Sequence, residues 1–308
     1  MATFAQYMRC LRRLALASLR GDKASAVKER RLLAFRLLHG HAEQLTFTRA
    51  GIHWTVEVDS GVVPRKLFVR EKAFEPLRAA LVKWLTAYGC ISARRRTLID
   101  IGANIGTPSV QLARETDLDV LAIEPVPSNF ELLKRNVAQN GLDSKIRCLQ
   151  AAVSTHPGTV KMAVPKERAA CEVVEEGRQP GFGPLTPEIP VIQVPSLRLE
   201  TILETHAIAA ANIAVVWCDV QGLEREVIES APGVWRAGVP LYLELWPKGM
   251  EAHGGVRAFL ETVQANFKSF VMVSEMIKIG AHAQPRPLNE LQKVVEAIGS
   301  SHDDALLI

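Results

Sequence analysis

The feature that most constrains this chain is an apolar segment that runs into a glycine turn, followed by a second apolar segment that ends in a carboxylate. The first segment is Leu98–Gly106, with the sequence LIDIGANIG, and the second ends in Ile123-Glu124-Pro125. Consecutive segments of this kind are typical of parallel strands in a doubly wound sheet, where ligands bind at the carboxyl ends of the strands. We therefore expect an α/β fold with a ligand site at the glycine turn.

The glycine turn predicts a particular kind of ligand. Gly102 and Gly106 carry no side chain, so the backbone there can approach a ligand closely. The helix that we expect to begin at Gly106 offers free N–H groups to an anion. Glu124 lies 24 residues after Asp100, where a carboxylate can accept two hydrogen bonds from a ribose diol. The pattern indicates a cofactor that contains adenosine.

The spacing of the turn favours S-adenosylmethionine over a dinucleotide. A G-x-G-x-x-G fingerprint would place glycines at Gly102, Asn104 and Thr107, and two of the three are missing. The observed pattern, D-x-G-x-N-x-G, suits a ligand with an amino acid end. Asp100 supplies negative charge for an ammonium group, and the backbone N–H groups near 104–106 supply donors for a carboxylate. A tight turn without any ligand is the alternative.

Composition limits the size, compartment and membrane topology of the protein. The 308 residues, 48% of them hydrophobic, suffice for one large α/β domain with a small addition, or for two small domains. The five cysteines show no paired spacing, which favours a reducing compartment, so we expect a cytoplasmic protein. No apolar run approaches the roughly 20 residues that a transmembrane helix needs.

The charge of the chain is concentrated near its start. Residues 1–40 hold nine Lys or Arg against Asp22 and Glu29, while the whole chain has a net charge of +4. The domain with the glycine turn is therefore not basic, which argues against extensive nucleic-acid binding by it. Residues 4–38 have an amphipathic helical pattern. We expect this helix to pack on its own domain or to form a homodimer, with contact to an anionic lipid surface as the alternative.

The sequence as a whole predicts three regions, with boundaries near 42 and 97. Residues 1–42 form the basic helical segment, 43–97 a lead-in with strand-like alternation over 44–70 and a helix over 74–88, and 98–308 the cofactor domain. Residues 165–195 are rich in proline and glycine and predict a long loop. The cofactor domain alternates strands and helices. Its strands are expected at 98–102, 119–124, 146–153, 159–164, 213–219, 239–245, 269–274 and 303–308, and its helices at 106–115, 127–139, 196–205, 223–230, 254–266 and 287–298.

Five segments in this order resemble the FkbM-type methyltransferases: TLIDIGANIGTPSVQLA, VLAIEPVPSNFELLKRNVAQNGL, AAVSTHPGTVKM, WCDVQGLEREVIESA and PLYLELWP. The resemblance covers roughly residues 45–308. It implies the class I methyltransferase fold, with seven strands of which the last is inserted antiparallel. It also implies S-adenosylmethionine as methyl donor and a hydroxyl as the usual acceptor.

The chain departs from the family pattern at one motif. The family commonly has Lys-x-Asp-x-Glu-Gly where this chain has Trp217-Cys218-Asp219-Val220-Gln221-Gly222. Asp219 and Gly222 are kept, but Trp217 and Gln221 are not the usual residues. The departure bears on the acceptor and not on the cofactor.

The chemistry of methyl transfer points to carboxylates at the strand ends. An acceptor hydroxyl must be held in line with the methyl group and must lose its proton, for which a general base helps. Asp219 is our first choice for this role, with Glu244 or His253 assisting. Glu224 and Trp246 are the expected substrate contacts, although a carboxylate in the first turn of a helix also stabilises the helix by itself. Clustered carboxylates could hold Mg²⁺, but no ligand set fixes such a site, and we expect no metal.

The turn and the resemblance together predict an O-methyltransferase that acts on a small molecule or a sugar. The alternatives are a nucleic-acid methyltransferase with a basic N-terminal arm and a non-catalytic cofactor-binding protein. The Asn/Asp-Pro-Pro-aromatic motif of amino-methylating enzymes is absent at 219–222. The expected cofactor contacts are Asp100, Gly102, Ala103, Asn104, Gly106, Glu124, Asn129, Ala151, Ala152 and Asp219.

Overall fold

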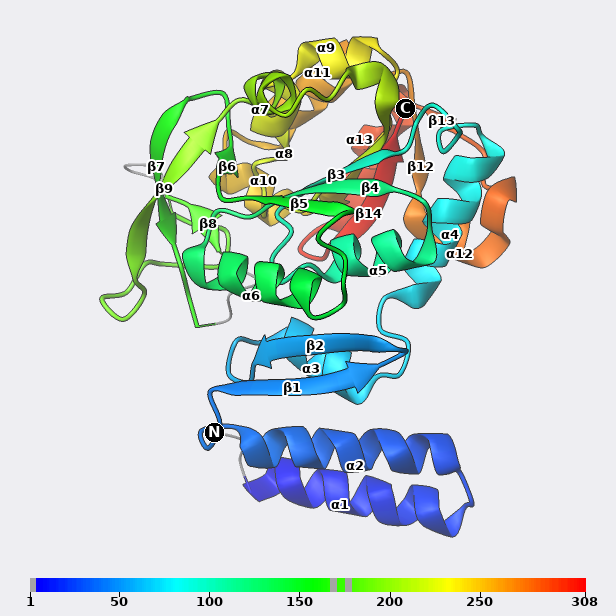
Figure 1. Cartoon of the computed structure of the whole chain (residues 1–308), viewed down its shortest axis with the longest axis vertical. Coiled ribbons are helices and arrows are strands. Elements are labelled where there is room, and N and C mark those ends of the chain that lie inside the picture. The colour runs from blue at the N-terminus through cyan, green and yellow to red at the C-terminus, as the bar shows by residue number, and fades with distance from the viewer. Residues whose placement is uncertain (1–3, 167–170, 175–178) are drawn as a thin grey trace. The chain divides into compact units, whose positions relative to one another are not determined.

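The computed structural model describes residues 4–166, 171–174 and 179–308, and the chain forms two compact units (Figure 1). The N-terminal unit consists of the chain up to Phe74 together with Lys166. The second unit begins at Glu75 and contains the large sheet. Within the described ranges, no helix is long and apolar enough to span a lipid bilayer.

The N-terminal unit is built from a helical hairpin, a β-hairpin and a short helix. The segment expected as one helix over 4–38 is instead two helices, because the chain reverses at Gly21 (φ +67°) and the Asp22 side chain caps the second helix by accepting from Ser25 N at 3.0 Å. A helix also replaces the strand pattern expected towards residue 70. The elements are α1 (Phe4–Leu19), α2 (Lys23–Leu38), β1 (Gln44–Arg49), β2 (Ile52–Glu57) and α3 (Val62–Val69).

The two compact units divide at 74/75, whereas the predicted boundaries lie near 42 and 97. Helix α2 packs against both α1 and α3, so the basic segment is not separate from the residues that follow it. Helix α4 (Glu75–Ala87) packs on α12 (Val273–Ile279), and Trp84 Nε1 donates to the carbonyl oxygen of Ala283 at 2.9 Å. Long-range packing of α4 therefore assigns it to the second unit.

The second unit contains an eight-stranded sheet with the order β13-β12-β14-β11-β10-β3-β4-β5. The five strands from β11 to β5 are parallel, and β14 lies antiparallel between β11 and β12. This confirms the predicted class I methyltransferase fold, to which β13 adds a short edge strand. The strands are β3 (Thr97–Ile101), β4 (Asp119–Ile123), β5 (Ile146–Leu149), β10 (Ile213–Cys218), β11 (Leu241–Leu245), β12 (Ser269–Met272), β13 (Arg286–Pro287) and β14 (Asp303–Leu307).

Helices cover both faces of this sheet (Figure 1). Because strand side chains alternate between faces, Ile99, Ile101, Val216 and Cys218 point to one side, where they pack with residues of α7, α8, α9, α11 and α13. Asp100 and Trp217 point to the opposite side. The remaining helices are α5 (Thr107–Glu115), α6 (Pro127–Ala138), α7 (Leu199–Thr205), α8 (Glu224–Glu229), α9 (Pro232–Arg236), α10 (Pro247–Ala252), α11 (Val256–Asn266) and α13 (Leu291–Ile298).

A second sheet with the order β6-β9-β7-β8 replaces part of the expected loop at 165–195. Its strands are β6 (Ala152–Val153), β7 (Gly158–Ala163), β8 (Glu172–Val173) and β9 (Val191–Leu197). The strand expected at 146–153 is divided between the two sheets, and the helix expected from 196 begins at Leu199. Pairing of β9 with β7 overrides the proline-rich composition of the segment. Residues 167–170 and 175–178 of the expected loop lie outside the described residues.

Candidate active site

The carboxyl ends of four adjacent parallel strands bring the predicted acidic residues together. Asp100 lies near the end of β3, Glu124 directly follows β4, Asp219 directly follows β10, and Glu244 lies near the end of β11. Burial raises the pKa of Asp100, Glu124 and Glu244, and charge repulsion from Asp219 raises it further. The four residues form one electrostatic cluster at this edge of the sheet.

Gly102 is required by the protein itself at this edge. It adopts φ +81°, and a Cβ atom there would overlap the backbone carbonyl of Asp219. Asp219 N donates to the carbonyl oxygen of Ile101 at 3.0 Å, so the ends of β3 and β10 are in direct backbone contact. Asn104 also has a positive φ, 53°, which asparagine tolerates better than most residues. The turn sequence therefore serves strand packing as well as any ligand.

Glu124 is buried and organises the turn. Its Oε2 accepts from Asn104 N at 2.8 Å, and its Oε1 accepts from Val126 N at 3.0 Å and from Asn129 Nδ2 at 3.3 Å. Burial nevertheless raises its pKa to about 7. A carboxylate offers about four acceptor positions, so Oε2 can accept one further bond. Glu124 and Asn129 are thus adjacent, as expected for cofactor contacts.

The backbone donors expected near 104–106 are already used, which corrects one prediction. Asn104 N donates to Glu124, Ile105 N donates to Asn104 Oδ1, and Gly106 N donates to the carbonyl oxygen of Ala103, the last two at 2.8 Å. A tight turn satisfies its own N–H groups, and the sequence pattern does not reveal this.

Asp100 offers a better polar partner for a ligand than the turn donors do. Its Oδ2 accepts from the Ser109 hydroxyl of α5, while its Oδ1 is buried and has no hydrogen-bond partner among the described residues. Burial raises the pKa of Asp100 to about 7. A buried oxygen without a partner is costly. A cofactor with an ammonium group fits this position, because it would supply the missing donor.

Gln221 joins two of the carboxylates. Its Nε2 donates to Asp219 Oδ1 at 2.7 Å and to Glu244 Oε2 at 3.4 Å. Although Asp219 keeps exposed surface, partial loss of water around its carboxyl group raises its pKa, and the hydrogen bond from Gln221 lowers it. Burial, with Asp219 as the next cause, raises the pKa of Glu244 to about 8. The pair therefore favours a state in which one carboxyl group is protonated and the other can accept a proton.

Glu224 is buried behind this pair and holds the turn that presents it. Its Oε1 accepts from Val220 N at 3.3 Å and from Gly222 N at 3.4 Å, and burial raises its pKa to about 7. A Cβ at Gly222 would lie 2.5 Å from the backbone of Gly249, so this turn packs directly on the start of α10. Substrate contact by Glu224 stays a prediction.

His253 and Trp246 lie with a different group of residues. His253 is buried, with Nε2 3.7 Å from Oε2 of the fully buried Glu172. Glu172 also accepts from Gly181 N at 2.7 Å and Phe182 N at 3.0 Å. The Trp246 ring occupies the space beside Gly181, where a Cβ would approach it to 2.8 Å. His253 therefore lies beside β8, and Trp246 lies beside the segment between β8 and β9.

Three residues near Glu244 were missed by sequence reasoning. His302 Nε2 lies 3.9 Å from Glu244 Oε1, Asp304 is the register partner of Glu244 in β14, and Tyr242 stacks on Trp217 with ring centroids 3.8 Å apart. The only sequence signal was the polar run His302-Asp303-Asp304 before the final apolar residues. Of the remaining predicted cofactor contacts, Ala103, Ala151 and Ala152 are buried.

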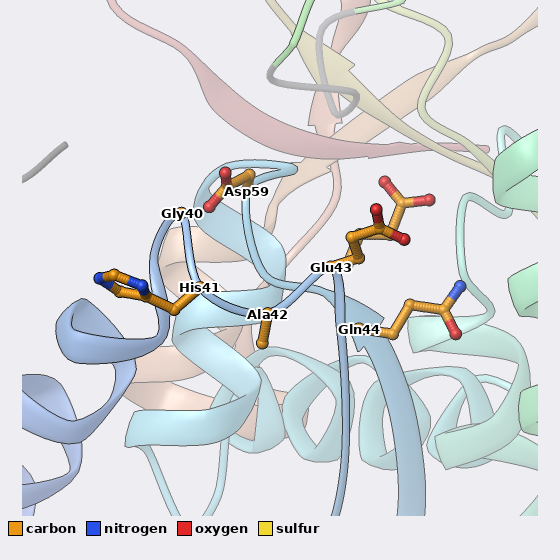
Figure 2. A pocket seen from close by; sticks show the side chains of 7 residues that line it. Gly40, His41, Ala42, Glu43, Gln44 and Asp59 are labelled. Atoms are coloured by element: carbon orange, nitrogen blue, oxygen red, sulfur yellow. The ribbon is translucent and has the colours of Figure 1, made fainter.

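The N-terminal unit has a pocket that is lined by residues other than those of this cluster. Figure 2 shows its lining side chains, among them His41, Glu43 and Asp59. Asp59 pairs with His39 at 2.8 Å and with Lys166 at 3.6 Å. None of the predicted site residues lines the pocket. Across the part of the chain that the structure describes, no group of three His, Cys, Asp or Glu side chains is arranged to hold a metal ion.

One family model matches more than half of this chain, and several known proteins are similar to parts of it. The family model described as "Methyltransferase FkbM domain" matches residues 100–268. Methyltransferase sdnD of Sordaria araneosa is 36% identical over 66 residues, which is 21% of this chain and only 26% of that protein. The TYW2 structure from P. horikoshii in complex with MeSAdo is 13% identical, with a TM-score of 0.41, over 86% of this chain and 70% of that one. A geranyl diphosphate methyltransferase with SAM is 12% identical, with a TM-score of 0.40, over 79% and 88%.

Proposed function

The chain belongs to the FkbM family of methyltransferases, whose methyl donor is S-adenosylmethionine, and from that premise we propose that it methylates a hydroxyl group of a small molecule or a sugar. The observation that supports this proposal is the Asp219–Gln221–Glu244 arrangement at the strand ends. When bound, the cofactor supplies an electrophilic methyl group on a cationic sulfonium. We expect Glu124, Asn129 and Asp100 to hold it.

Asp219 and Glu244 can have different roles towards an acceptor hydroxyl, one accepting its proton and the other binding its oxygen. An ordinary aspartate has a pKa near 3.9 and is a weak base at neutral pH. Since the surrounding protein raises the pKa of Asp219, its carboxylate becomes a better proton acceptor. Glu244, whose pKa is raised to about 8, can donate a hydrogen bond to the acceptor oxygen. Gln221 holds the two carboxyl groups near each other, because its amide donates to both.

Transfer of labelled methyl groups tests the proposal. The full chain is incubated with S-adenosylmethionine labelled in the methyl group and with separate pools of sugars, phenolic alcohols, amines and nucleic acid. We expect label only in hydroxyl compounds, as an ether that resists mild base. Label in the amine or nucleic-acid pools, or a base-labile methyl ester, would assign another acceptor.

Gln221→Glu, which introduces the residue common in the family, is expected to shift the pH profile. The change removes a donor that now lowers the pKa of Asp219 and adds a third carboxyl group. Because only the ionised carboxylate accepts a proton, activity is lost as the pH falls through its pKa. We expect the acid limb of kcat/KM to move up by about one pH unit, with roughly tenfold lower activity below that limb.

Gln193→Glu, on an exposed position of β9, is the matched control and should leave the pH profile unchanged. An acid limb that stays in place in Gln221→Glu would show that Gln221 does not control the ionisation of the catalytic carboxylate.

A further inference from the structure

Helix α1 exposes an apolar stripe on the side that faces away from its partner helix. Within the N-terminal unit α1 is an outer layer and packs on α2 (Figure 1). Cys10 and Ala17 are buried, whereas Met8, Leu11, Leu16 and Leu19 are exposed, Leu19 to 84%. At 3.6 residues per turn, positions 8, 11, 16 and 19 fall on one side of the helix. Exposed leucines gathered in this way differ from apolar residues scattered over a surface.

Arginines lie within and beside the same stripe. At 3.6 residues per turn Arg12 falls between Leu16 and Leu19, and Arg9 and Arg20 fall at the edge of the stripe. Arg9, Arg12 and Arg20 are exposed and form no ion pair among the described residues. The two acids of the hairpin are engaged elsewhere. Asp22 caps α2, and the buried Glu29 lies 4.0 Å from Arg13. The exposed side of α1 is therefore both apolar and strongly cationic.

We propose that α1 lies flat on the surface of an anionic lipid bilayer. An interfacial helix combines an apolar face, which enters the boundary between headgroups and acyl chains, with basic residues that meet anionic headgroups. The 16 residues of α1 span about 24 Å, too short to cross a bilayer but long enough to lie along it. The side chains of Arg9, Arg12 and Arg20 can extend to the headgroups while their aliphatic stems stay in contact with the apolar layer.

Charge complementarity favours an anionic lipid surface over a second copy of the chain and over a nucleic acid. A second copy packed on the same face would bring its own Arg9, Arg12 and Arg20 against those of the first copy. A nucleic acid would meet the arginines but would leave the leucines in contact with phosphate and water. Only an anionic membrane surface pairs with both parts of the stripe.

Vesicle sedimentation with the full chain tests the proposal. We expect the protein to bind vesicles of phosphatidylcholine and phosphatidylserine in equal parts at least about tenfold more strongly than vesicles of phosphatidylcholine alone, and to be released by high salt. The double variant Leu16→Asn/Leu19→Asn should lose about tenfold or more of this binding. Arg9→Gln/Arg12→Gln should lose a similar amount, and the remaining binding should depend less on salt.

Matched controls come from the second unit. Ile279→Asn removes a similarly exposed apolar side chain, and Arg257→Gln removes an exposed arginine, and neither should change vesicle binding. Circular dichroism verifies that the variants keep their helices. Equal binding to both vesicle types, or full binding by both double variants, would overturn the proposal. So would a dimer in light scattering that the leucine variant abolishes while vesicle binding is absent.

Discussion

Replacing Asp219 by asparagine is expected to lower turnover by about 10²–10⁴-fold, the usual range for a general base or positioning group. The amide keeps the shape of the carboxylate but cannot take the proton of the acceptor hydroxyl, and it loses the charge that interacts with Gln221. Cofactor affinity should stay within about threefold, because the backbone contact between Asp219 and Ile101 is unchanged. Turnover is measured with the identified acceptor at saturating cofactor.

Asp117→Asn, at an exposed position before β4, is the control for the loss of one negative charge. If Asp219→Asn kept more than about a third of native turnover, the catalytic role would belong to another residue. Glu244→Gln and His253→Ala would then be the next variants to compare.

Replacing Glu124 by alanine is expected to weaken S-adenosylmethionine binding at least about tenfold. The change removes an acceptor for the ribose, where a hydrogen bond to a charged group contributes about 1.5–3 kcal/mol. It also removes the acceptor for Asn104 N, Val126 N and Asn129 Nδ2, so the turn itself should loosen. Calorimetric titration measures the affinity, and chemical denaturation should show a loss of about 1–3 kcal/mol in the free energy of unfolding.

Glu131→Ala provides the matched control, since this glutamate lies on α6 with a side chain 68% exposed. Unchanged cofactor affinity in Glu124→Ala, or tight NAD binding by the native chain, would contradict the assignment of this site.

Much of the fold and part of the site could be predicted, because their signals are local. Apolar runs followed by Gly102 and by Glu124 mark strand ends within a few residues, and strand ends in a parallel sheet meet at one edge. Asp100 and Glu124 were therefore predicted at the cofactor turn, and Asp219 and Glu244 were predicted at strand ends. The family resemblance supplied the antiparallel last strand.

The remaining features depend on contacts between distant segments. Nothing local to Gln221 indicates that its amide reaches both Asp219 and Glu244, because Glu244 arrives from another strand. His302 comes near Glu244 only through the pairing of β14 with β11. The backbone N–H groups at 104–106 donate to acceptors within the protein. This depends on backbone geometry, which residue types do not indicate.

By itself, the sequence determined the alternation of strands and helices, the glycine turn and the acidic strand ends, since each follows from periodicity and side-chain chemistry within a short window. The tertiary structure alone decided that α4 belongs with the large sheet, that β9 pairs with β7 across a proline-rich segment, and that His253 lies beside Glu172. These outcomes depend on which surfaces gain most from mutual burial over the whole chain, and no short window contains that information.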